Sequence, residues 1–182
     1  MIRVVGHDPA WASMFEAAAE QVMAATGDAA VRIHHIGSTA IALAPAKPII
    51  DMMLEVASLD ALDAASPGIE ALGYEAMGEF GIPGRRYFRL DDAEGTRTHH
   101  LHAFEAGVPD VARHLAFRDY MRAHPSEARE YGVLKEQLAQ AHRFDMAAYS
   151  AGKNAFVKER ERRALLWAGH HGTQDALDRL GC

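Results

Sequence analysis

The chain has 182 residues, of which 49% are hydrophobic and 24% charged, and its formal net charge is -6. This length and balance predict one folded domain with a real core rather than a disordered chain. The 25 acidic residues outnumber the 19 Lys and Arg, which opposes the phosphate attraction on which nucleic-acid-binding proteins rely. We therefore expect no nucleic-acid partner.

The number of cysteines and the hydropathy of the sequence indicate in which cellular compartment the protein is found. The only cysteine is Cys182, so an intrachain disulfide, a CxxC pair and a thiolate zinc cluster are ruled out. The sequence has no stretch near the roughly 20 apolar residues that span a bilayer, and its N-terminus lacks an apolar signal core. These features predict a cytoplasmic protein without a membrane partner.

Strands dominate the first part of the chain. A first helix is predicted to start at Asp8-Pro9, which suit the cap and first helical position, and to end at residues 26–28. Residues 31–36 form a short β-branched run that predicts a strand ending at a Gly-Ser pair. Residues 49–56 are almost continuously apolar, as in a central strand, and Asp51 and Glu55 interrupt them.

The spacing of the apolar residues changes from strand-like to helical further along the chain. A helix is predicted from a Ser58 cap to Leu72, with a break at Pro67-Gly68. Strand-like segments follow, and a turn at 91–95 predicts that the last two form a hairpin. The helical period then takes over, with breaks at Pro125 and at Phe144-Asp145. The strand segments are 74–80, 85–90 and 96–104, and the helical segments are 110–124, 126–143 and 146–168.

Together these elements predict an α/β (α+β) fold, with a mixed β-sheet flanked by helices and a helical C-terminal third. We expect a single domain over residues 1–168, its sheet core at about 1–108 and its helical part at about 109–168. Residues 169–182 are expected to be a flexible tail.

The most informative stretch reads HIGSTA at residues 35–40, followed by AKPIIDMMLE at residues 46–55. Gly37 lets the backbone approach an anion closely, while the Ser38 and Thr39 hydroxyls and nearby N-H groups can donate to phosphate oxygens. Asp51 can hold a divalent cation that neutralises the phosphate charge. A plain tight turn and an Asp51 that caps the backbone or pairs with Lys47 or an arginine are the structural alternatives.

These strings resemble the signature of the GrpB family, a branch of the nucleotidyltransferase superfamily whose shared pattern is a Gly-Ser turn followed by an acidic strand. The segments RTHHLH at 97–102 and HLAFRDY at 114–120, with Tyr149, Lys153 and Phe156, also resemble it. The resemblance implies a nucleotidyltransferase-like fold and a nucleoside triphosphate as ligand. It implies that Gly37 and Ser38 contact the nucleotide phosphates and that Asp51 is the catalytic, metal-binding carboxylate.

The pattern implied by the resemblance normally runs Asp-x-Asp/Glu, but this chain has Met53 at the second acidic position. Glu55 lies about 13 Å from Asp51 at about 3.3 Å per strand residue, whereas paired metals lie about 4 Å apart. A third ligand is expected from a neighbouring strand, where His100 and His102 share one face. Carboxylates favour Mg²⁺ or Mn²⁺, whereas imidazoles point to a transition metal such as Zn²⁺.

Basic residues complete the predicted site. Lys47 is the first candidate to neutralise phosphate, ahead of three arginines of the 85–90 strand. Lys153 lies four residues after Tyr149 on a predicted helix and can face the same ligand, although a solvated surface lysine is the alternative. The three arginines are Arg85, Arg86 and Arg89.

The first hypothesis is a nucleotidyltransferase that moves a nucleotidyl or phosphoryl group from a nucleoside triphosphate to a small-molecule acceptor. The second is a non-catalytic nucleotide- or phosphate-binding accessory domain. Some GrpB-like domains are fused to dephospho-coenzyme A kinase, so the resemblance allows a link to coenzyme A synthesis. The third is a hydrolase whose transition metal is held by Asp51, His100 and His102. The helical third is expected either to cover the site or to form a homodimer contact.

Overall fold

The computed structural model of the protein describes residues 1–171. Contacts divide the chain into two compact units, each built from segments that are distant in sequence. The sheet unit comprises Pro9–Ala40 and Ile49–Val111. Within the described residues, the helical unit comprises Met1–Asp8, Ile41–Pro48 and residues 112–171. Within residues 1–171, no helix is both long enough and apolar enough to cross a membrane.

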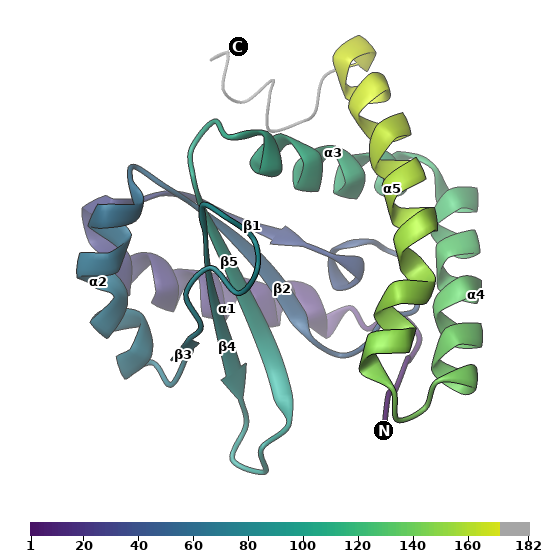
Figure 1. The fold of residues 1–182 in the computed structure, drawn as a ribbon, viewed down its shortest axis with the longest axis horizontal. Helices are drawn as coiled ribbons and strands as arrows, with labels where there is room; N and C mark the ends of the chain where they lie inside the picture. Colours follow the sequence, from purple (N-terminus) through teal and green to yellow (C-terminus); the bar gives the residue numbers. More distant parts are fainter. Residues whose placement is uncertain (172–182) are drawn as a thin grey trace. The chain divides into compact units, whose positions relative to one another are not determined.

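The sheet unit is a five-stranded mixed sheet in the order β1-β2-β5-β4-β3 (Figure 1). The parallel pair is β2 with β5, and the other neighbouring strands are antiparallel. The predicted mixed sheet flanked by helices is thereby confirmed. The strands are β1 (Ala30–Ile36), β2 (Ile50–Val56), β3 (Glu75–Ala76), β4 (Arg85–Asp91) and β5 (Arg97–Glu105).

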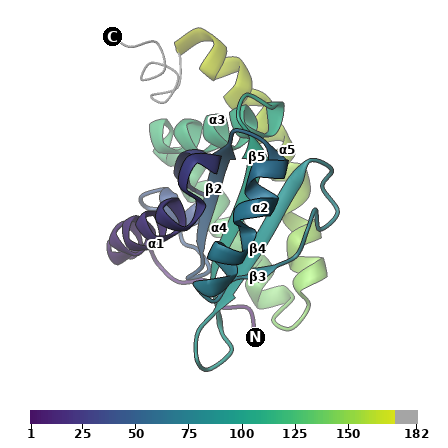
Figure 2. The same ribbon diagram turned by 90° about the vertical axis from the view of Figure 1, so that its left-hand side faces the viewer.

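Two helices, α1 (Ala10–Thr26) and α2 (Leu59–Ala71), pack against each other and cover one face of the sheet (Figures 1 and 2). Phe15 of α1 stacks on the His35 ring of β1, with ring centroids 4.8 Å apart. Since side chains alternate along a strand, Asp51 of β2 points to the opposite face. We call this second face the site face.

Helix α2 runs through Pro67 without the break that the sequence predicts at Pro67-Gly68, so that prediction was wrong. Proline removes a single helical hydrogen bond, and close packing on α1 favours the helical path. A Cβ at Gly68 would lie 2.8 Å from the backbone oxygen of Ala25, so the glycine permits that approach. The predicted Ser58 cap is confirmed, because its side chain accepts a hydrogen bond from the Ala61 N-H.

The strand predicted at 74–80 is shorter than expected, because only Glu75–Ala76 pair with β4. Gly78 and Phe80 have φ values of 60° and 45°, a conformation that turns the chain out of an extended path. The hairpin predicted around residues 91–95 is confirmed by the antiparallel pairing of β4 with β5.

The helical unit contains most of α3 (Pro109–Ala123), together with α4 (Pro125–Ala141) and α5 (Met146–His171). Helices α4 and α5 lie side by side (Figure 1), and Tyr131 of α4 stacks on Phe156 of α5 with centroids 5.3 Å apart. The N-terminal segment joins this unit through a bridge between Val5 and Ala46. Of the predicted tail, residues 169–171 belong to α5 and the rest lies outside the described residues.

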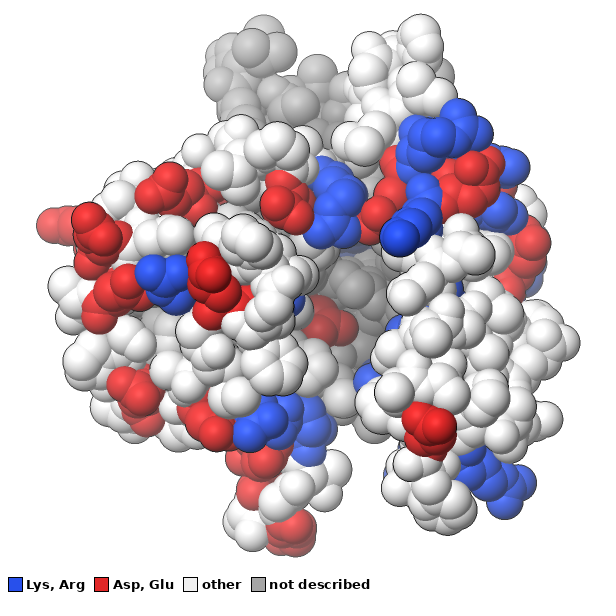
Figure 3. All heavy atoms as spheres, in the orientation of Figure 1, with Lys and Arg blue, Asp and Glu red and all other residues white. Residues whose placement is uncertain are grey.

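Ion pairs link α5 to α4, where acidic and basic side chains interleave on the surface (Figure 3). Arg160 contacts Glu127 at 2.6 Å and Glu130 at 2.9 Å. Arg163 contacts Glu159 on its own helix at 2.8 Å and Glu127 at 3.3 Å. Each exposed ion pair of this kind contributes little to stability.

Candidate metal and phosphate site

Asp51 is the least buried residue of β2, because the remaining residues of this strand are all buried. The parallel register sets Asp51 opposite His100 and Met53 opposite His102. Paired residues of neighbouring strands share a face, so the carboxylate and both imidazoles project from the site face. The cluster therefore follows from strand register rather than from any local loop.

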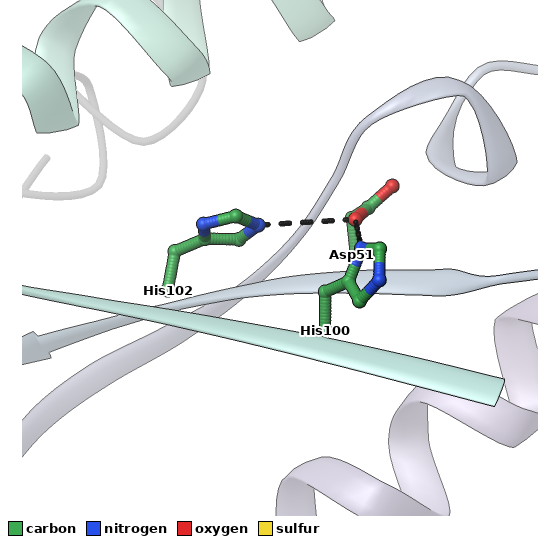
Figure 4. A group of neighbouring side chains, drawn as sticks. All are labelled: Asp51, His100 and His102. Carbon is green, nitrogen blue, oxygen red and sulfur yellow. Dashed lines mark hydrogen bonds and ion pairs between the residues drawn. The ribbon is translucent and has the colours of Figure 1, made fainter. Parts of the chain in front are cut away.

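The three side chains converge on one point. Nδ1 of His100 lies 2.9 Å from Oδ1 of Asp51, and Nε2 of His102 lies 3.8 Å from the same oxygen. Figure 4 shows both rings directed at that oxygen, with the second carboxylate oxygen turned away from them. One ligand atom from each residue lies within 4.8 Å of the other two, close enough to hold a metal ion.

The carboxylate of Asp51 is held in its charged form. Burial by itself raises the pKa of Asp51, but hydrogen bonds from His100 and His102, together with their charges, outweigh it. The pKa of Asp51 is therefore well below its ordinary value. A carboxylate that stays ionised in a half-buried position suits cation binding.

The Gly-Ser turn lies directly against this carboxylate. Gly37 follows β1 with φ at 69°, a conformation that favours glycine. A Cβ at this position would lie 2.6 Å from Oδ2 of Asp51. Only glycine leaves room for this close approach, which brings the predicted turn and the predicted carboxylate together.

Ser38 and Thr39 occupy different environments, although both begin the 3₁₀ helix Ser38–Ala40. The Thr39 hydroxyl is buried, lying 2.9 Å from Nε2 of His35, and donates to the Ile49 carbonyl oxygen at 3.4 Å. Ser38 is half-buried. Thr39 is thus committed to anchoring the turn, which leaves Ser38 as the hydroxyl better placed for a ligand.

Two residues of strand β4 belong to the cluster. Sequence reasoning named Arg85 only as a lesser candidate to neutralise phosphate, and it did not name Tyr87. The Tyr87 ring packs against both imidazoles, with centroid distances of 5.6 Å to His100 and 5.2 Å to His102. Arg85 reaches the far side of His102, with Nη1 lying 3.4 Å from Nδ1. The predicted turn at 91–95 is the sequence signal that could have placed both residues at the cluster. The hairpin that it closes pairs Tyr87 with His102.

The second acidic residue of β2 pairs with a buried histidine outside the cluster. Glu55 is on the same face as Asp51, but its Oε1 lies 2.7 Å from Nε2 of His34 and both side chains are 4% exposed. Met53, between the two acids, is fully buried. The described residues therefore offer one carboxylate to the cluster, in agreement with the expectation that Glu55 does not replace the missing acid.

The other predicted basic residues fall outside this cluster. Arg86 forms a two-pronged contact with Asp63 of α2, each bond 2.7 Å long. Arg89 pairs with Glu75 at 2.5 Å. Because both arginines have carboxylate partners, neither is a ready phosphate ligand, and the preference for Lys47 over them is consistent with this.

Lys47 and Lys153 belong to the helical unit, where they meet at one aromatic ring. The Nζ atoms of Lys47 and Lys153 lie 5.7 Å and 4.6 Å from the ring centroid of Tyr149. Tyr149 is 1% exposed, and burial raises its pKa to about 12. The predicted phosphate ligands therefore divide into two groups, with Gly37, Ser38 and Thr39 in the sheet unit and the two lysines in the helical unit.

The fold is nucleotidyltransferase-like. Similar folds are found in Cid1, in complex with its short product ApU, and in terminal uridylyl transferase 4 from Trypanosoma brucei with bound dUTP. The TM-scores are 0.54 and 0.52, at 10% and 11% identity. Each match covers 81% of this chain, and 48% and 52% of the respective neighbour.

A family model described as GrpB protein matches residues 1–163, and the chain belongs to the GrpB family. The crystal structure of conserved protein GrpB from Enterococcus faecalis has a TM-score of 0.85 and 41% identity. The match covers 90% of this chain and 97% of that one. The resemblance read from the HIGSTA and AKPIIDMMLE strings is thereby confirmed.

Sequence relatives include the UPF0157 protein YqkA from Bacillus subtilis, which is 43% identical over 91% of this chain. This chain spans 48% of the length of YqkA. A UPF0157 protein from Pseudomonas aeruginosa is 36% identical over 98% of this chain and 74% of its own length. A dephospho-CoA kinase from Mycolicibacterium paratuberculosis is 28% identical over 94% of this chain, which spans 48% of the kinase.

Proposed function

We propose that this chain binds a nucleoside triphosphate together with a divalent metal and transfers a nucleotidyl or phosphoryl group to a small-molecule acceptor. The observation that carries the proposal is the junction of Gly37, Asp51 and the two imidazoles. A glycine turn that abuts an ionised carboxylate can place phosphate oxygens beside a cation. The nucleotidyltransferase-like fold supports the same reading.

The donor set fits a divalent cation. Asp51 would hold the metal, and His100 and His102 are the candidates for further ligands, since the ligand atoms of the three residues lie within 4.8 Å of one another. A carboxylate suits Mg²⁺ or Mn²⁺, and imidazole nitrogen suits Zn²⁺ or Fe²⁺. When bound, the cation would neutralise charge on the phosphate oxygens.

In nucleotidyl transfer an acceptor hydroxyl oxygen forms a bond to the α-phosphorus, and the bond from that phosphorus to the bridging oxygen of the β-phosphate breaks. Pyrophosphate leaves, and the hydroxyl proton passes to water. The protein's part is positioning and charge stabilisation. Gly37 and Ser38 would orient the phosphates, and the ionised Asp51 would keep the cation in place.

The test is the melting temperature of the wild type and Asp51→Asn with each of four nucleoside triphosphates, and with coenzyme A, in the presence and absence of Mg²⁺ or Mn²⁺. A ligand at 100 times its Kd stabilises by about 2.7 kcal/mol. We expect one nucleotide to stabilise the wild type only with metal and to have no effect on Asp51→Asn. Absence of any shift in the wild type would overturn the proposal. Asp63→Asn, a surface substitution on α2, is the control.

Turnover is tested separately with α-labelled nucleotide and a panel of small hydroxyl- and phosphate-bearing acceptors. Release of pyrophosphate with transfer of label to a small product supports the transferase. Extension of an oligonucleotide would instead assign a nucleic-acid acceptor, against the expectation from the net charge of -6.

The second candidate is a non-catalytic nucleotide- or phosphate-binding accessory domain. It is favoured by Met53 at the second acidic position and by Glu55, whose carboxylate contacts His34 at 2.7 Å, because two-metal transfer needs more than one carboxylate. The similarity to a dephospho-CoA kinase makes coenzyme A synthesis a setting for this role. Metal-dependent binding without turnover of the labelled nucleotide would assign it.

The third candidate is a hydrolase that uses a transition metal. The donor set of one carboxylate and two imidazoles favours it. Elemental analysis of protein purified without added metal separates it from the first two candidates, because a histidine site retains zinc, iron or nickel whereas a magnesium site does not.

A further inference from the structure

Arg85 is a buried cation at the edge of the cluster of Asp51, His100 and His102, with 7% of its surface exposed. Its Nε donates to the Glu79 carbonyl oxygen at 3.2 Å, and its Nη2 donates to the Phe80 carbonyl oxygen at 2.8 Å. The remaining Nη1 lies 3.4 Å from Nδ1 of His102. Two backbone anchors therefore hold the guanidinium against one nitrogen of His102.

Arginine offers only donors, so in the neutral imidazole this contact selects which nitrogen carries the proton. A guanidinium has five N-H groups and no acceptor, and it stays charged in proteins. Nδ1 of His102 must therefore be the acceptor, and neutral His102 carries its proton on Nε2. Nε2 is the nitrogen that lies 3.8 Å from Oδ1 of Asp51.

The surrounding rings keep His102 in this orientation. Its centroid lies 5.2 Å from that of Tyr87, and the Arg85 Cζ lies 5.1 Å from the same tyrosine centroid. His100 packs edge-on at 6.2 Å. These contacts fix the plane of the ring, and the approach of Nη1 to Nδ1 selects one of its two flipped orientations, because the other would set a ring carbon against the guanidinium.

This arrangement disfavours coordination of a metal ion by Nε2 of His102. A metal bound at Nε2 needs the lone pair there, which moves the proton to Nδ1 and sets that N-H against a guanidinium N-H. Histidine ligands ordinarily donate their second N-H to a carboxylate, carbonyl or water, and loss of such a partner costs about 10- to 100-fold in affinity. A cation bound through the Asp51 oxygens does not require this proton shift.

We propose that Arg85 is a positioning residue that fixes the Nε2-H tautomer of His102, and so selects cations bound by oxygen over transition metals that need imidazole nitrogen. The inference rests on the proposed function, because it assumes that the cluster binds a divalent cation. In this arrangement His102 donates its Nε2-H toward the Asp51 carboxylate or an incoming phosphate oxygen.

The experiment compares Arg85→Gln with Arg85→Met in the full chain. Both variants remove the charge, but only glutamine offers a carbonyl that can accept from Nδ1-H. We expect Zn²⁺, titrated by calorimetry, to bind Arg85→Gln about tenfold more tightly than Arg85→Met. Mn²⁺ is expected to bind both variants equally. Arg86→Gln, a charge removal on the opposite face of the sheet, is the control and should leave the ratio of Zn²⁺ to Mn²⁺ affinity unchanged.

The tautomer is measured directly in the wild type, which needs no Arg85 variant to fold. Long-range proton-nitrogen spectra at about pH 8, above the ordinary imidazole pKa of about 6.5, distinguish the two tautomers, and His102→Gln assigns the signal. A proton on Nε2 supports the inference and a proton on Nδ1 overturns it. Equal Zn²⁺ affinity in the two variants also overturns it. If no divalent cation binds any of these proteins, the proposed metal site itself fails.

Discussion

Gly37 and Asp51 are in direct backbone-to-carboxylate contact: a Cβ at position 37 would lie 2.6 Å from Oδ2 of Asp51 and 3.0 Å from its Cβ. Gly37 follows β1 directly and Asp51 is the second residue of β2. The two strands are antiparallel neighbours, and their register pairs Ile36 with Asp51. The strand pairing therefore places the turn over the carboxylate. A side chain at this glycine cannot be accommodated without displacing the acid.

Gly37→Ala is expected to abolish nucleotide- and metal-dependent stabilisation, because the new methyl group displaces the Asp51 carboxylate. The matched control is Gly95→Ala in the β4–β5 hairpin, where φ is 76° and no atom lies within 4 Å of the added Cβ. The positive φ alone costs about 1–2 kcal/mol of stability in both variants. Thermal melts with and without nucleotide and Mg²⁺ measure the difference. Equal ligand responses in the two variants would show that the contact is irrelevant to binding.

Glu55 is expected to act in stability rather than in metal binding. His34→Ala removes a buried partner at 2.7 Å and should lower the free energy of unfolding by about 3 kcal/mol. Glu55→Gln keeps a hydrogen-bonding group and should cost less. Urea unfolding measures both effects, and calorimetric metal titration of Glu55→Gln should match the wild type. A large loss of metal affinity in Glu55→Gln would make Glu55 a ligand instead.

Lys47 and Lys153 remain predicted phosphate ligands. Lys47→Gln and Lys153→Gln should each weaken nucleotide binding about tenfold, since one charge-assisted hydrogen bond contributes about 1.5 kcal/mol. Lys158→Gln, at an exposed position of the same helix as Lys153, is the control. Calorimetric titration with nucleotide decides the matter. Wild-type affinity in both variants would assign the lysines a structural role around the Tyr149 ring.

The Arg86–Asp63 contact predicts a pH-dependent contribution to stability. The hydrogen bond from Arg86, which outweighs the opposing effect of burial, lowers the pKa of Asp63 from its ordinary value of 3.8. A lowered pKa in the folded state stabilises the protein above the unfolded value, and this contribution disappears as the pH falls through the folded value. Asp63→Asn should cost less than 1 kcal/mol at pH 7 because the pair is partly exposed. Urea unfolding should show this difference shrinking below about pH 4, whereas a constant difference would exclude the linkage.

Local patterns in the sequence predict most elements of the sheet unit. The β-branched run before Gly37, the apolar run around Asp51 and the turn at 91–95 correspond to β1, β2 and the β4–β5 hairpin. The break expected at Pro67 and the length of the strand from Tyr74 were wrong. In the first case packing on α1 outweighs local propensity, and in the second glycine turns outweigh it.

The sequence by itself determined the residue types available for chemistry: a Gly-Ser turn, one acid in an apolar strand, and two histidines spaced to share a face. Only the tertiary structure decided that Asp51 lies opposite His100, a residue 49 positions away. It also decided that Glu55 is occupied by His34 and that Arg85 faces His102. The physical reason is that strand register between distant segments depends on the packing of whole faces, because a shift of one residue would turn each of these side chains to the opposite face.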